Sequence, residues 1–152
     1  MKVMKEVGMS ASLLAILAIH REEGLNRTEL AGMSGFSFTQ CAHVLPLLQE
    51  KDFVRVDNES SSHGTPRYLI ARDPDTIKMI DLFNTFDDVF FNSACLFCKV
   101  RCKRDNKTQR CPFGMEVVAM ERKLKKWMRG ITIADLVDMS VDKTWIPQKA
   151  AE

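Results

Sequence analysis

The residues best suited to chemistry lie in one short segment that holds four of the chain's five cysteines. It follows the pattern C-x2-C-x3-C-x8-C, in the residues Cys95, Cys98, Cys102 and Cys111. Thiolates so close in sequence can bind one soft metal centre with little ordering of the chain between them. Residues 92–114 hold a single acidic residue, Asp105, and six basic ones: Lys99, Arg101, Lys103, Arg104, Lys107 and Arg110. Because nearby cations favour the metal-binding thiolate, the segment predicts a metal site.

The same cysteines could instead be buried apolar residues, disulfide partners or ligands of structural zinc. A protein core seldom buries cysteines among so many basic side chains, and disulfide frameworks belong to secreted chains. Zinc remains an alternative because Cys95-x2-Cys98 is a suitable half-site, although zinc ribbons usually add a second such pair. Uneven spacing and the Cys111-Pro112 ending are typical of iron–sulfur proteins, so an iron–sulfur cluster is the favoured cofactor.

Length and composition indicate a small folded protein without a membrane span. The chain has 152 residues, 45% of them hydrophobic, and a net charge of +2, which does not by itself indicate a nucleic-acid partner. After the apolar run Met9–Ile19, a charged stretch stands where a signal peptide would have its cleavage site. No run reaches the ~18 apolar residues that cross a bilayer. We therefore expect a cytoplasmic protein without a membrane partner, and the lack of a catalytic grouping of His, Asp or Ser predicts no enzyme.

The first half of the chain predicts three helices. Apolar residues recur at helical spacing in a first helix that takes up most of residues 9–22. Asn26 or Thr28 can cap a second helix that ends near Gly35, and Ser37 can cap a third. The inward positions of the third helix are Cys41, Val44, Leu45 and Leu48. Cys41 is thereby assigned to the core and not to the metal site.

A hairpin is expected after the third helix, which should kink or break at Pro46. Its strands are the extended runs Phe53–Asp57 and Arg67–Ala71. Two helices joined by a short turn and followed by a wing form a DNA-binding arrangement. On the third helix, the candidate base-reading residues are Ser37, Thr39, Gln40 and His43, and on the wing the candidate phosphate or minor-groove contacts are Arg55, His63 and Arg67.

The second half predicts a helix over Thr76–Phe86, an apolar segment over Val89–Phe97, and a long helix after the cysteines. Apolar residues on that long helix are spaced 4, 3, 4, 3: Phe113, Val117, Met120, Leu124 and Trp127. This spacing is typical of a helix that packs against a second copy of itself, and packing on the chain's own core is the alternative. A last short helix covers Ile131–Met139.

We predict a mainly α fold: a winged helix-turn-helix with a two-stranded wing and a long C-terminal dimerisation helix. The expected division is a DNA-binding domain over 1–86, the cysteine loop and dimerisation helix over 87–141, and a mobile tail over 142–152.

The chain resembles the IscR/NsrR/RirA family of bacterial winged-helix transcription regulators over nearly its whole length. The resemblance depends on Gly35-Phe36-Ser37, on the wing exit Tyr68–Pro74, on Ile77–Leu82 and on the closing phrase Gly130–Val137. It implies a homodimer that binds a palindromic operator in double-stranded DNA and holds one iron–sulfur cluster per protomer. Gain or loss of the cluster, through redox state, nitric oxide or iron–sulfur supply, would change the affinity for DNA.

The chain departs from the family pattern in three places. Cluster-binding members supply three cysteines and often a histidine three residues after the last one, but here that position is Gly114 and a fourth cysteine is present. An all-cysteine set suits a 4Fe-4S or 2Fe-2S cluster, and zinc as well. Pro66-Arg67 replaces a Gly-Gly pair before the wing tyrosine, and Pro46 lies in the third helix, so the operator sequence does not carry over. A zinc-stabilised repressor of the same fold and a small iron–sulfur electron carrier are the competing hypotheses.

Overall fold

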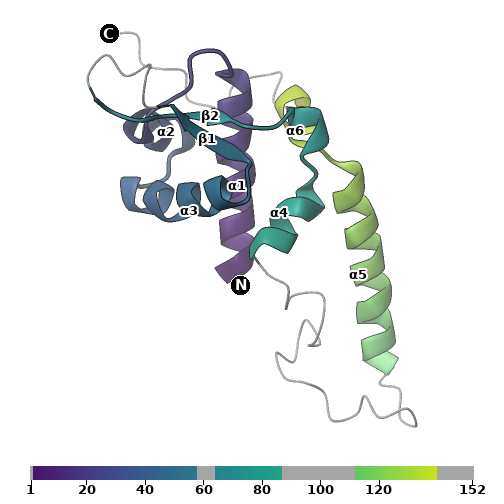
Figure 1. Cartoon of the computed structure of the whole chain (residues 1–152). Coiled ribbons are helices and arrows are strands. Elements are labelled where there is room, and N and C mark those ends of the chain that lie inside the picture. The colour runs from purple at the N-terminus through teal and green to yellow at the C-terminus, as the bar shows by residue number, and fades with distance from the viewer. Residues whose placement is uncertain (1, 58–63, 87–111, 140–152) are drawn as a thin grey trace.

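The computed structural model of the chain describes residues 2–57, 64–86 and 112–139. Its elements are α1 (Lys2–Ile19), α2 (Arg27–Ser34), α3 (Phe38–Glu50), β1 (Val54–Asp57), β2 (Arg67–Ile70), the 3-10 turn η1 (Pro74–Thr76), α4 (Met79–Phe86), α5 (Pro112–Gly130) and α6 (Ile133–Met139). In Figure 1, α1, α2, α3 and the hairpin form one body, from which α5 projects. The predicted winged helix-turn-helix with a two-stranded wing and a long C-terminal helix is confirmed.

The first helix begins and ends earlier than predicted, at Lys2 and Ile19 instead of within 9–22. Val7 and Met9 are buried, so the core extends along the N-terminal half of α1, where the sequence shows a weaker pattern. After Ile19 a turn follows, in which the Gly24 N–H donates to the His20 carbonyl at 3.0 Å. Gly24 has a φ of +59°, a left-handed conformation that directs the chain into the second helix.

Local capping signals fix the helix-turn-helix. Asn26 and Glu29 form a capping box at the start of α2, and Gly35 ends the helix with a φ of 71°. Ser37 caps α3 as predicted, in a second capping box with Gln40. The turn between the two helices is therefore short and held at both ends by side-chain hydrogen bonds to the backbone.

The third helix continues through Pro46 to Glu50, so a break at this proline is not observed. Pro46 is exposed, which lets its ring stand in solvent on the outer face of the helix. The opposite face has the predicted composition, because Cys41, Val44, Leu45 and Leu48 are all fully buried. Burial of these four side chains holds α3 in place against the loss of one backbone hydrogen bond.

The wing is an antiparallel pair of strands, in which Val54 lies opposite Ile70 and Asp57 lies opposite Arg67. Each strand is one residue shorter than predicted, at the Phe53 end and at the Ala71 end. Leu25 adds an isolated bridge to Tyr68, with backbone hydrogen bonds of 3.0 and 2.8 Å. The base of the wing is thereby joined to the start of the helix-turn-helix.

Helices α4 and α6 begin later than predicted because a backbone bridge takes up the residues before them. Lys78 pairs with Thr132, so α4 begins at Met79 instead of Thr76, and α6 begins at Ile133 instead of Ile131. The Met79 N–H donates to the Ile131 carbonyl at 3.0 Å, and the Ile133 N–H donates to the Ile77 carbonyl at 2.9 Å. The bridge brings together the two ends of residues 79–131.

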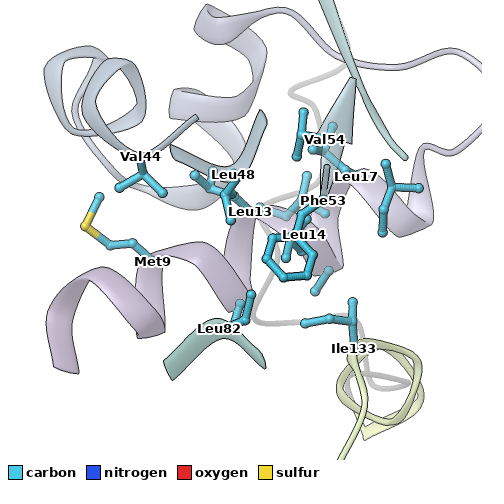
Figure 2. Packing of buried hydrophobic residues seen from close by; sticks show 14 of the residues in the cluster. Met9, Leu13, Leu14, Leu17, Val44, Leu48, Phe53, Val54, Leu82 and Ile133 are labelled. Atoms are coloured by element: carbon cyan, nitrogen blue, oxygen red, sulfur yellow. The ribbon is translucent and has the colours of Figure 1, made fainter. Parts of the chain in front are cut away.

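Figure 2 shows how the core gathers side chains from α1, α3, the start of β1, α4 and α6. Leu14 of α1 and Phe53 before β1 lie close to Leu82 of α4 and Ile133 of α6, and all four are buried. The C-terminal helix α6 packs against α1, so it shares this core. The predicted boundaries near residues 86 and 141 lie at the edges of the described ranges, and the three-part division stays a prediction.

Among the described residues, no helix combines the length and the apolar character that a bilayer crossing requires.

Candidate nucleic-acid interface

The four predicted base-reading residues lie at the cap and in the first half of α3, and two of them also cap the helix. The Ser37 hydroxyl accepts from the Gln40 backbone N–H at 3.2 Å, and Gln40 Oε1 accepts from the Ser37 N–H at 2.9 Å. Both side chains are consequently fixed by the capping box. The structure places them at the exposed end of the helix, and their contact with bases stays a prediction.

Thr39 and His43 are the freer pair on the outer face of α3. Both are exposed, and a spacing of four residues places them one above the other on the helix. His43 Nε2 lies 3.3 Å from Glu6 Oε1, so the imidazole touches the N-terminal part of α1. The outer face of α3 thus presents short polar groups of the size that reaches base edges in the major groove.

The predicted DNA contacts on the wing differ in their exposure and in their contacts within the fold. Arg55 is exposed on β1, opposite Leu69 in the strand register. Arg67 is instead used within the fold: its Nε donates to the Glu23 carbonyl and its Nη2 donates to the Gly24 carbonyl, both at 2.9 Å. The Nη2 atom also lies 3.4 Å from a carboxylate oxygen of Glu29. His63 lies outside the described residues.

A cluster that the sequence did not single out joins α2, α3 and the wing. The Arg27 guanidinium lies 5.2 Å from the centre of the Phe38 ring and 5.9 Å from that of Tyr68, and its Nη2 donates to the Tyr68 hydroxyl at 2.8 Å. Phe38 is the first residue of α3, and 53% of it is exposed. The signal in the sequence was an aromatic residue directly after the helix cap, in the first turn, where the helix dipole favours acidic side chains.

Cys41 is buried beneath this cluster, as predicted. Burial raises the pKa of the Cys41 thiol, while a hydrogen bond with Ser34 and the nearby charge of Arg27 act in the opposite direction. The thiol therefore stays protonated in the core, which agrees with its assignment as a packing residue.

The predicted metal ligands Cys95, Cys98, Cys102 and Cys111 lie outside the described residues. Within the described part of the chain, no group of three or more His, Cys, Asp or Glu side chains is arranged to hold a metal ion. The metal site stays a prediction from the sequence.

The described side chains of the long helix α5 form one face that is buried against the chain and a neighbouring face that is exposed. Met128 is fully buried, and Leu124 is half-buried against the core of the chain. Met120 and Trp127 are 46% and 54% exposed. They are separated by seven residues, or about two turns, so they share a side of the helix. Leu124 therefore serves the chain's own core in part, and the side chains of Phe113 and Val117 lie outside what the structure describes.

Solved structures of other proteins have the same fold. IscR of T. potens matches with a TM-score of 0.69 and 16% identity, over 91% of this chain and 88% of that one. CymR, the global cysteine regulator of B. subtilis, matches with a TM-score of 0.67 and 16% identity, over 88% of this chain and 94% of that one. The chain has the fold of IscR and CymR. CymR of Staphylococcus aureus gives a TM-score of 0.65 at 12% identity, over 88% of this chain and 95% of that one.

The IscR and CymR fold is the one that the family resemblance in the sequence implied. No family of known sequences and no curated protein matches the chain. At these identities the likeness extends to the fold, and the functional residues have to be argued from this chain's own side chains.

Proposed function

We propose that the protein is a homodimeric transcription regulator that binds a palindromic operator in double-stranded DNA. The observation that carries the proposal is the capped helix α3, with Thr39 and His43 exposed, beside a wing with Arg55 exposed, in a fold shared with IscR and CymR. A helix fits the major groove of B-DNA, and its side chains can reach the base edges there. A basic wing residue then supplies a phosphate contact that adds affinity without sequence preference.

In vitro selection from random duplexes tests this function directly. We expect the full chain to enrich a two-fold symmetric sequence, and Thr39→Ala and His43→Ala each to weaken binding to it about 5- to 150-fold in a gel shift, the range for one base contact. Gln49→Ala, an exposed change in the last turn of the same helix, is the matched control and should leave the affinity unchanged. Failure to enrich any sequence would overturn the proposal.

Support for the homodimer comes from α5. Exposed apolar surface along one side of a helix is typical of an interaction site, and Met120 and Trp127 are exposed on the same side of α5, about two turns apart. In a fold in which α5 projects from the body, a second copy of α5 is the natural partner (Figure 1). Trp127→Glu should convert the dimer to a monomer in sedimentation equilibrium, whereas Lys126→Glu, an exposed change at the next position, should not. A protein that is already monomeric would contradict this part.

The proposed cofactor is an iron–sulfur cluster, held by Cys95, Cys98, Cys102 and Cys111. The donor set fits, because four thiolates are the usual ligands of 4Fe-4S and 2Fe-2S clusters. When bound, such a cluster would supply a redox- and nitric-oxide-sensitive centre. Four thiolates also fit zinc, which is colourless. Anaerobic purification should therefore give a coloured protein with matching iron and sulfide contents, and a colourless protein with one zinc per chain would identify the zinc-stabilised repressor.

The cysteines are connected to α3, the reading helix that would enter the major groove, through α5. This helix begins at Pro112, directly after Cys111. Its 19 residues extend for about 28 Å. At the far end, Met128 is buried and the Lys78–Thr132 bridge joins the chain to α4. A restraint on Cys95–Cys111 would therefore act on the start of a helix whose end is fixed to the DNA-binding body.

Such a restraint can set the spacing of two reading helices, which must lie about 34 Å apart to bind successive major grooves. Coupling of this kind usually amounts to about 1–3 kcal/mol, or about 5- to 150-fold in affinity. We expect the anaerobic loaded protein to differ from the metal-free protein and from Cys98→Ala by at least about fivefold in operator affinity. Equal affinity in all three would rule out control by the cluster and leave the DNA-binding function intact.

A further inference from the structure

Phe38 has an unusual position for a large aromatic residue. It is the first residue of α3, directly after the cap Ser37, and more than half of its surface is exposed. The two exposed candidates for base reading, Thr39 and His43, follow it on the same helix. A side chain that packed only within the fold would be turned toward the core, as Phe36 is two residues earlier.

The Phe38 ring is exposed but not loose. The Arg27 guanidinium lies 5.2 Å from the ring centre, within the range of a cation–π interaction. The guanidinium is itself held, because its Nη2 donates to the Tyr68 hydroxyl at 2.8 Å. Its Nε is buried and has no hydrogen-bond partner among the described residues. A partly desolvated cation attracts an aromatic face more strongly than a hydrated one does. Arg27 therefore holds the ring from one side and leaves the rest of it open to solvent.

The chemistry of the major groove indicates what an apolar ring at this place would contact. The base edges there present hydrogen-bond donors and acceptors, and one apolar group, the C5-methyl of thymine. A polar side chain gains nothing from that methyl, whereas a fixed aromatic ring removes it from water. The N-terminal end of a recognition helix is the part that meets base edges.

We propose that Phe38 is a specificity-determining residue that contacts the C5-methyl of a thymine in each half-site, and that Arg27 is the residue that positions its ring. This inference rests on the proposed function, because it names one element of the sequence that α3 reads. It also gives Tyr68 a role: through Arg27, the wing strand β2 is tied to the first residue of the reading helix.

The test uses the full chain and the duplex obtained from in vitro selection, with single thymines replaced by deoxyuridine to remove only the methyl group. At one position in each half-site, the native protein should bind the thymine duplex about fourfold more tightly per methyl group than it binds the deoxyuridine duplex. This is the factor expected for burying one methyl group. Phe38→Ala should still bind the operator, with a thymine-to-uracil ratio near one. Phe38→Leu should retain part of the ratio because it restores an apolar side chain.

Arg27→Met removes the positioning charge and should lower the same ratio, while melting curves confirm that the variant is folded. If Phe38→Ala keeps the native ratio, or if no thymine position responds to loss of its methyl, the assignment of Phe38 is wrong and the DNA-binding function stands. If selection enriches no sequence, the proposed function fails and this inference fails with it.

Discussion

Replacement of Arg67 tests whether this wing arginine serves the fold or the DNA. Its guanidinium donates to the carbonyls of Glu23 and Gly24, both at 2.9 Å, and lies 3.4 Å from a Glu29 carboxylate oxygen. Because the side chain is 23% exposed, each charged hydrogen bond is worth about 1–2 kcal/mol and the ion pair about 0–1 kcal/mol. Arg67→Met keeps the apolar stem and should lower the free energy of unfolding by about 2–5 kcal/mol.

Chemical denaturation and gel shifts on the same variants separate the two roles. For a chain of this length, the loss of stability in Arg67→Met corresponds to a fall in melting temperature of about 4–20 °C. Arg55→Met is the matched control, because Arg55 is exposed on the neighbouring strand. It should change stability by less than about 0.5 kcal/mol, weaken operator binding and reduce the slope of log affinity against log salt by about one.

The opposite pattern would refute this assignment. If Arg67→Met melts like the native protein and loses as much DNA affinity as Arg55→Met, the Arg67 guanidinium contacts phosphate. Its hydrogen bonds to the carbonyls of Glu23 and Gly24 then contribute little to stability. The folded fraction of each variant must be established by circular dichroism before the affinities are compared, because an unfolded variant also fails to bind.

Three further predictions concern the elements that position the reading helix. Gly24→Ala places a Cβ 2.9 Å from Leu69 Cγ and from the Tyr68 carbonyl oxygen at a left-handed φ, whereas Gly35→Ala has a similar φ but open space around the new Cβ. In urea denaturation, Gly24→Ala should lower the free energy of unfolding by about 1–3 kcal/mol more than Gly35→Ala does. Equal losses in the two variants would mean that β2 moves aside at no cost. Hydrogen bonds from the backbone N–H and the hydroxyl of Thr132 hold the pKa of Asp135 below its ordinary value of 3.8. Since the pKa of Asp135 is lower in the folded state, its carboxylate stabilises the fold above pH 4, and this stabilisation is lost on further acidification. The difference in melting temperature between the native protein and Asp135→Asn should therefore be larger at pH 7 than at pH 3. A difference that is independent of pH would argue against the hydrogen bonds between Thr132 and the Asp135 carboxylate. Ser37→Ala should lower stability by about 1 kcal/mol through loss of the α3 cap, and Ser37→Asp, which also caps, should not; a loss in both would point to another cause.

The parts of the fold that the sequence predicted well are those with local causes. Asn26 or Thr28 was expected to cap α2, and Ser37 to cap α3, because such side chains reach the backbone three residues on; Asn26 and Ser37 do so. The buried face of α3 and the two wing strands follow from residue spacing, and the structure reproduces them. For such features the sequence contains all the partners within a few residues.

The features that were missed depend on partners far apart in the chain. Arg67 was expected at the DNA surface, since nothing near it in sequence shows that the carbonyls of residues 23 and 24 lie beside it. The starts of α4 and α6 were misplaced because Lys78 and Thr132 pair across more than fifty residues. The Arg27 and Phe38 cluster also needs the fold to bring it to Tyr68. Pro46 was expected to kink or break its helix; the break is not observed, because burial of four side chains on the opposite face keeps the helix continuous, and the kink stays a prediction.

The Lys78–Thr132 bridge has a consequence for how such a chain can diverge. It joins the two ends of residues 79–131 by backbone hydrogen bonds, so these two ends are held next to each other. An insertion or deletion inside that stretch, far from the bridge, leaves the separation of its ends unchanged. The helix-turn-helix and its wing can therefore be retained while the segment between α4 and α5 changes in length or composition.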